Sequence, residues 1–158
     1  SGRDENKRAP FPWGDHDKVC AGPPDMESFD AAPFGSLAGQ RDDPNSVYGY
    51  IREAIHLRAR HPLIARGRTV PVPEDSETGR ELKEHPALCA FLRTGGKEAA
   101  GGGDARDLLI IVNTGSETVT LPTDRMELAD SLSTGGEQAA LDADGRLTLP
   151  GYGVAVLK

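Results

Sequence analysis

The clearest periodic pattern in the sequence runs from about residue 43 to residue 61. Apolar residues recur there at helical spacing and form one broad face, made of Val47, Tyr48, Tyr50, Ile51, Ala54, Ile55 and Leu57. Asp43 can cap the start of such a helix, Pro44 suits its first position, and Pro62 ends it. A face this wide predicts a helix that is buried against two neighbours rather than one.

The remainder of the chain has the pattern of short strands. A short helical turn at residues 63–65, ended by Gly67, precedes them. The clearest strands are expected at Ala87–Arg93, Leu108–Asn113, Glu117–Leu121, Met126–Leu132, Arg146–Leu149 and Val154–Leu157. The turn residues between them fit hairpins, and residues 95–105 are typical of a flexible hairpin tip. This spacing predicts a small antiparallel β-sandwich of roughly 90 residues.

The first 43 residues show neither a helical nor a strand period. They contain five prolines, yet they also hold four of the chain's eight aromatic residues, namely Phe11, Trp13, Phe29 and Phe34. Disordered segments are poor in aromatic residues, which need a surface to pack against. We therefore expect an ordered functional loop whose supporting body is missing or lies elsewhere in the chain.

Composition excludes several classes of protein. The 158 residues correspond to roughly one domain. The net charge of -7 argues against nucleic-acid binding, which requires a basic face. Apolar runs such as Leu108–Val112 are far shorter than the ~20 residues of a membrane span. The chain begins with Ser1 rather than Met, so we expect it to be processed, tagged or cut from a longer protein.

Cys20 and Cys89 are the two cysteines of the chain. They are too few for a disulfide framework or a four-ligand zinc site, although they could pair once. Two reduced thiols in a cytoplasmic protein are the simpler interpretation. No secretion signal opens the sequence, which also favours the cytoplasm.

Several patterns that can carry chemistry are weak in this sequence. The glycine run at residues 101–103 lacks the GK[ST] ending of a phosphate-binding loop. The stretch 15–17, Asp-His-Asp, has no second cluster at metal-ligand spacing. The many carboxylates of the N-terminal loop are expected to be ordinary solvated acids. We predict no catalytic residue, no metal site and no cofactor in this chain.

Arg8 is the exception among the charged residues. It is the last of five charged residues between positions 3 and 8, and it precedes a cluster of prolines and aromatics that ends at Trp13. The X-Pro sequence restricts the backbone there. A fixed arginine beside aromatic rings can clamp sugar hydroxyls or a carboxylate. A purely structural ion pair is the alternative, and the residues alone favour it.

Five segments of the chain resemble enzymes of the alpha-amylase family, glycoside hydrolase family 13. The sequence RDENKRAPFPWG at residues 3–14 is similar to the segment after the eighth barrel strand in its oligo-1,6-glucosidase and neopullulanase-like branches, with Phe11 in place of the usual methionine. GPPDM at residues 22–26 resembles another part of that loop. Residues 43–67 resemble the last barrel helix and its exit, and residues 108–122 with 149–158 resemble strands of the C-terminal sandwich.

The resemblance implies a division of the chain into two parts. Residues 1–67 would be the loop and last helix of a truncated (β/α)₈ barrel, and residues 68–158 the C-terminal β-sandwich domain. The loop would lie over the active-site face, where Arg8 would bind substrate. The nucleophilic Asp, the acid/base Glu and the second Asp of the family would precede Ser1. The chain alone would then be inactive, and its partners would be alpha-glucan oligosaccharides bound through the parent barrel.

A non-catalytic carbohydrate-binding β-sandwich module is the alternative function. Such modules use exposed aromatic platforms, but after residue 50 the only aromatic residues are Phe91 and Tyr152. Phe91 lies in an apolar strand and is expected to be buried, which argues against a module. Linkage preference, hydrolysis against transglycosylation and oligomeric state stay open. We also expect the fragment, whose helix would expose its apolar face, either to self-associate or to pack that helix more tightly on the sandwich.

Overall fold

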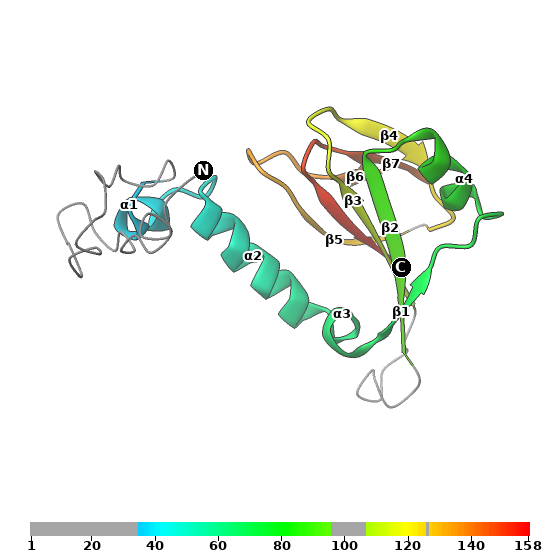
Figure 1. Cartoon of the computed structure of the whole chain (residues 1–158), viewed down its shortest axis with the longest axis horizontal. Coiled ribbons are helices and arrows are strands. Elements are labelled where there is room, and N and C mark those ends of the chain that lie inside the picture. Colours follow the sequence, from blue (N-terminus) through cyan, green and yellow to red (C-terminus); the bar gives the residue numbers. More distant parts are fainter. Residues whose placement is uncertain (1–34, 96–106, 126) are drawn as a thin grey trace, which may run out of the picture. The chain divides into compact units, whose positions relative to one another are not determined.

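The computed structural model describes residues 35–95, 107–125 and 127–158 (Figure 1). The chain divides into two compact units, Ser1–Ile51 and Arg52–Lys158. The helices are α1 (Leu37–Arg41), α2 (Val47–Arg60), α3 (Pro62–Arg66) and α4 (Glu77–Glu84). No helix in the described ranges is long and apolar enough to cross a membrane.

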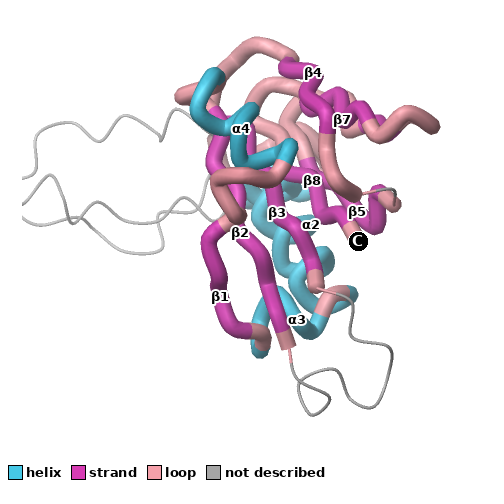
Figure 2. Tube along the Cα trace, turned by 90° about the vertical axis from the view of Figure 1, so that its right-hand side faces the viewer, coloured by secondary structure: helices cyan, strands magenta, loops and turns pink. Residues whose placement is uncertain are grey.

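The second unit is mainly antiparallel β structure, as the sequence predicts. Its strands are β1 (Arg68–Pro71), β2 (Leu88–Thr94), β3 (Leu108–Asn113), β4 (Val119–Pro122), β5 (Leu128–Leu132), β6 (Ala140–Leu141), β7 (Arg146–Leu149) and β8 (Val154–Leu157). They form a five-stranded sheet in the order β1-β2-β3-β8-β5 and a three-stranded sheet in the order β4-β7-β6. Figure 2 shows β1, β2 and β3 side by side in this order.

The main core lies between the two sheets. Leu109 and Ile111 of β3 and Leu157 of β8 are buried there against Leu147 and Leu149 of β7. These residues are spaced by two along each strand, so their side chains share the inner face. Facing apolar layers of this kind are what hold a β-sandwich together.

The outer face of the five-stranded sheet is also apolar. Leu108 of β3 and Val156 of β8 point away from the inner core and form a second cluster with Leu57 of α2 and Leu63 of α3. Because side chains alternate along a strand, Val112 lies on the same face as Leu108. Antiparallel sheets usually have one apolar and one polar face, whereas both faces of this sheet are apolar and need other elements to pack against them.

Helix α4 is absent from the sequence-based expectation, which placed only strands in this region. Its sequence, ETGRELKE, offers Leu82 as its one large apolar residue, too little to give a helical period. The helix begins because the Ser76 hydroxyl accepts a hydrogen bond from the Gly79 N–H at 2.9 Å. It contacts β2 and β4, one strand from each sheet, and thereby covers an edge of the core (Figure 1).

The start of α2 also differs from the expectation. The helix begins at Val47, and the Ser46 hydroxyl caps it by accepting a hydrogen bond from the Gly49 N–H at 3.0 Å. The Asp43 carboxylate instead accepts from the Asn45 N–H at 2.8 Å, inside the preceding turn. The prediction that Asp43 caps the helix is therefore wrong, because a better-placed cap lies three residues later.

Other boundaries agree closely with the pattern. Strands β3, β7 and β8 have the predicted bounds, and α3 ends at Gly67 as expected. The two-residue strand β6 and the strand β1 were not predicted, and neither was the five-residue helix α1. Elements this short are below the length at which periodicity is informative.

Asn113, at the end of β3, joins two turns of the second unit. Its side chain is 1% exposed. The amide nitrogen donates to the carbonyl oxygens of Glu117 at 2.8 Å and Pro150 at 3.1 Å, while its oxygen accepts from the Gly115 N–H at 3.0 Å. One buried amide thus satisfies backbone groups of both the β3–β4 turn and the β7–β8 turn, which buried polar groups require.

We predict that Asn113→Asp destabilises the chain by about 2–4 kcal/mol. The substitution keeps the shape but removes the donor, leaves carbonyl oxygens unsatisfied and buries a carboxyl group. Urea unfolding followed by circular dichroism measures the change. Thr120→Ala, which removes an exposed hydroxyl contact with Thr148, serves as the control and should cost less than about 0.5 kcal/mol. Equal stability of Asn113→Asp and the wild type would contradict this role.

Candidate functional site

The residues of most interest from the sequence lie outside the described ranges. Arg8, predicted to bind substrate, is among them, as are the Asp-His-Asp stretch at 15–17 and the glycine run at 101–103. Cys20 lies outside them too, whereas Cys89 is exposed on β2 with a free thiol.

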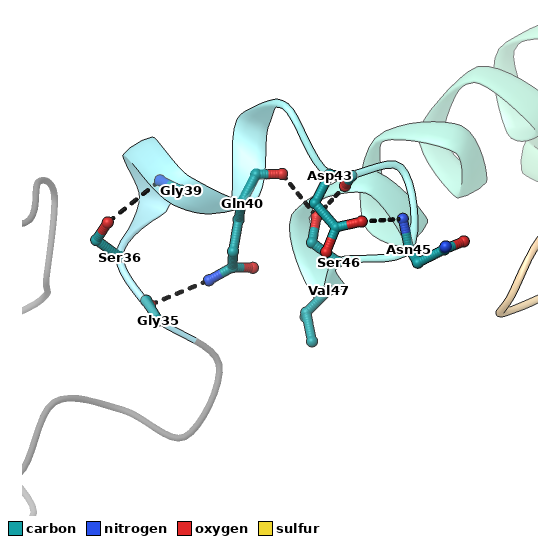
Figure 3. Close-up of a pocket in the computed structure, with 8 residues that line it drawn as sticks. All are labelled: Gly35, Ser36, Gly39, Gln40, Asp43, Asn45, Ser46 and Val47. Atoms are coloured by element: carbon teal, nitrogen blue, oxygen red, sulfur yellow. Dashed lines mark hydrogen bonds between the residues drawn. The ribbon is translucent and has the colours of Figure 1, made fainter.

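A pocket of about 330 Å³ lies in the described part of the first unit. Figure 3 shows its residues, which come from the segment before α1, from α1, from the α1–α2 turn and from the first residue of α2. The lining consists of Gly35, Ser36, Gly39, Gln40, Asp43, Asn45, Ser46 and Val47.

The polar groups of this pocket mostly hold its backbone. The Gln40 side chain donates to the Gly35 carbonyl oxygen at 3.3 Å and accepts from the Tyr48 N–H at 3.1 Å. The Ser46 hydroxyl lies 2.7 Å from the Gln40 carbonyl oxygen and 2.6 Å from that of Asp43. Asp43 is the only acidic residue of the lining, so the pocket lacks the carboxylate pair that glycoside hydrolysis needs.

A second polar cluster links the end of α2 to β5 within the second unit. The Arg60 guanidinium donates twice to the Asp130 carboxylate, at 2.8 and 3.1 Å, and His61 Nε2 lies 3.1 Å from the same carboxylate. The Ser131 N–H adds a hydrogen bond at 3.0 Å. A two-point arginine contact fixes orientation as well as distance. No sequence signal indicated this cluster, because its members are some 70 residues apart.

The cluster keeps Asp130 ionised. Burial raises the pKa of its carboxyl, but the hydrogen bonds from Arg60 and His61 outweigh burial and hold the pKa below its ordinary value of 3.8. A carboxyl whose pKa is depressed by folding stabilises the folded state above the unfolded pKa. That contribution is lost as the pH falls through the folded pKa.

We predict that Asp130→Asn lowers the free energy of unfolding at pH 7 by about 1–2 kcal/mol. The difference from the wild type should shrink as the pH falls from the ordinary pKa of 3.8, where the unfolded chain is protonated, through the lower pKa of the folded state. Urea unfolding at pH 7 and pH 3 measures both values. Glu127→Gln, which removes an exposed ion pair with Lys158, is the matched control and should change stability by less than about 0.5 kcal/mol. A deficit of Asp130→Asn that stays constant with pH would refute the ionic origin.

The described histidines do not assemble a metal centre. His56, His61 and His85 lie on or beside different helices, and no group of three or more His, Cys, Asp or Glu side chains within residues 35–95, 107–125 and 127–158 could hold a metal ion.

Helix α2 carries an uncovered apolar stripe. Val47, Ile51 and Ile55 follow one another at intervals of four residues, so they share one side of the helix. They are 45%, 53% and 61% exposed, whereas Leu57 is 7% exposed. Among the described residues, the prediction that the whole broad face is buried against two neighbours is therefore wrong. Leu57, near the end of the helix, is buried, whereas the three residues of the stripe are not.

A row of apolar side chains on the outer face of the five-stranded sheet is also incompletely covered. Strand register places Cys89, Val112, Val154 and Leu132 in this row, from β2 to β5. Cys89 is exposed and the other three are partly exposed. Phe91, the next outer residue of β2, is partly rather than fully buried. Apolar groups that gather on a surface in this way mark an interaction site.

We predict that the 158-residue chain self-associates through the α2 stripe. Replacing Ile51 and Ile55 together by Glu should shift it to a monomer, because two charges cannot be buried without partners. Size-exclusion chromatography with light scattering measures the change. The control places glutamates at Arg52 and His56, which are exposed polar positions of the same helix. If the control disperses the chain equally well, net charge rather than the stripe controls association.

Solved structures resemble this chain over most or all of its length, but the chain corresponds to only a part of each of them. Amy13B of Eubacterium rectale is 26% identical, with a TM-score of 0.76, and the match covers 100% of this chain and 28% of that one. The isomaltulose synthase of Erwinia rhapontici NX5, solved in complex with its natural substrate sucrose, is 21% identical with a TM-score of 0.63, covering 97% and 25%. The alpha-amylase of H. orenii is 20% identical with a TM-score of 0.54, covering 78% and 22%.

These matches define a class of fold. The chain is similar to the C-terminal portion of glycoside hydrolase family 13 enzymes, and it spans about a quarter of their length. No protein-family model matches the sequence, and no curated protein sequence matches it either.

Proposed function

We propose that this chain is the C-terminal part of a retaining alpha-glucan-active glycoside hydrolase. Its β-sandwich would be a structural cap that covers apolar surface of a catalytic barrel. The match that covers all of this chain and 28% of Amy13B supports this proposal. In the proposed division, residues 1–67 complete the barrel and residues 68–158 form the cap.

The observation that carries the proposal is the uncovered apolar surface. Ile51 and Ile55 are more than half exposed on α2, and the outer row of the sheet ends in the exposed Cys89. A sheet that is apolar on both faces and a helix with an uncovered stripe both need a further body to pack against. A barrel would supply that body.

The chemistry would come from the preceding part of the enzyme. Retaining hydrolysis uses a carboxylate nucleophile and an acid/base carboxylic acid about 5–5.5 Å apart. The sole acidic residue of the described pocket, Asp43, has no such partner in its lining. The resemblance assigns the nucleophilic Asp, the acid/base Glu and a stabilising Asp to the barrel strands that would precede this chain.

Arg8 would be this chain's contribution to the sugar pocket. Its guanidinium offers planar donors that suit a carboxylate or neighbouring sugar hydroxyls. The proline-rich sequence after it would restrict the backbone and so lower the entropic cost of binding. The substrates in this proposal are malto- or isomalto-oligosaccharides.

A free-standing carbohydrate-binding module has weaker support. Of the aromatic residues in the described part of the second unit, Tyr152 is the only one that is more than half exposed. One aromatic ring offers a sugar too little contact area for a module whose only function is to bind carbohydrate.

We predict that Arg8→Ala in the longer enzyme lowers kcat/KM on maltotriose or isomaltotriose by about 10–100-fold, through loss of a charged hydrogen bond. The circular dichroism spectrum and Tm should be unchanged. Arg8→Lys keeps the charge but loses the planar pair of guanidinium donors, so its kcat/KM should lie between those of the unsubstituted enzyme and Arg8→Ala. Unchanged kcat/KM for Arg8→Ala would remove Arg8 from the site. Lack of activity of the unsubstituted enzyme on both sugars would overturn the proposed substrate class.

A further inference from the structure

Tyr152 has an unusual backbone conformation in the β7–β8 turn. The Gly153 N–H donates to the Pro150 carbonyl oxygen at 3.1 Å, so residues 150–153 form a β-turn with Tyr152 in its third position. Tyr152 has φ +55°, and it is the only non-glycine residue in the described ranges with a positive φ. This position in a turn normally takes Gly or Asn, because a bulky side chain is strained there.

The neighbouring residues make this choice more informative. Gly151 and Gly153 flank Tyr152, yet neither has a positive φ. A Cβ on Gly151 would collide with the Ser116 carbonyl oxygen, so this glycine is needed for close packing. The chain therefore places its small residues beside the strained position and a large aromatic residue on it. Strain of this kind is kept at sites where the side chain has a use.

Hydrogen bonds to Asn113 and Gly115 hold the backbone of this turn. The Asn113 amide donates to the Pro150 carbonyl oxygen, and the Tyr152 N–H donates to the Gly115 carbonyl oxygen at 2.9 Å. The base of Tyr152 is thus fixed, while the residue is 53% exposed. An aromatic ring on a fixed base loses little conformational freedom when a ligand binds.

The surroundings of Tyr152 suit a sugar. The β3–β4 turn lies against this turn, because the Gly115 carbonyl oxygen accepts from the Tyr152 N–H and the Ser116 backbone packs against Gly151; it carries exposed Ser116, Glu117 and Thr118. An aromatic face can cover the apolar C–H face of a pyranose ring, while hydroxyl and carboxylate groups beside it can bond sugar hydroxyls. An apolar protein partner would not need this polar border.

We propose that Tyr152 is the stacking residue of a weak alpha-glucan-binding site on the β-sandwich. The site rests on the proposed function for the class of sugar. It would hold the glucan chain near the enzyme, and a single stacking contact corresponds to a Kd in the millimolar range.

The test titrates the 158-residue chain with maltoheptaose by isothermal calorimetry, in the monomeric Ile51→Glu/Ile55→Glu background. Tyr152→Gly should raise Kd at least tenfold. Its Tm should be unchanged or higher, because glycine suits a positive φ. Tyr152→Phe keeps the ring and should stay within about threefold of the unsubstituted background chain.

Other results would overturn the site. No maltoheptaose binding by the background chain, or equal binding by Tyr152→Gly, would exclude a sugar contact here. A lower Tm for Tyr152→Gly would show that the ring stabilises the fold. Loss of self-association by Tyr152→Gly in the chain that keeps Ile51 and Ile55 would indicate a protein contact instead. Each result is independent of the activity of the longer enzyme, which tests the proposed function separately.

Discussion

The structure depends on one constraint, which is that the five-stranded sheet is apolar on both faces. Strand β3 shows this most directly, because Leu109 and Ile111 enter the core between the sheets while Leu108 joins α2 and α3 on the other side. On the inner face Leu109 and Ile111 are buried, while Ala90 and Leu92 nearer the edge are partly buried. On the outer face Leu108 and Val156 are buried, but the row from Cys89 to Leu132 is not, and the exposed residues of α2 add to the uncovered area. A sheet of this kind is stable in water only when something covers its second face.

Two sets of hydrogen bonds, made by Asn113 and Asp130, fix the positions of turns and helix ends that apolar packing alone does not determine. Asn113 ties the β3–β4 turn to the β7–β8 turn at one end of the strands, and Asp130 ties Arg60 and His61 to β5. Hydrophobic burial is not directional, whereas these hydrogen bonds are, so they set the position of turns and of the α2–α3 junction. The same directional contacts hold the strained Tyr152 turn.

Much of the fold could be predicted from the sequence, and the reasons for success and failure are physical. Strands β3, β7 and β8 have long or regular apolar spacing and were predicted with correct bounds. Helix α4 was missed because a serine cap and tertiary packing stabilise it rather than an apolar period. The Asp130 cluster joins residues some 70 positions apart, and no local pattern in the sequence indicates the positive φ of Tyr152. Arg8 lies outside the described ranges, so its role stays a prediction.

The most direct test of the central claim is the coding sequence upstream of Ser1. The account predicts about 400 further residues, the part of Amy13B that this chain leaves uncovered, arranged as alternating strands and helices. Two Asp residues and one Glu should follow barrel strands there. A start codon close to Ser1 would contradict the account, because no catalytic barrel would then precede this chain.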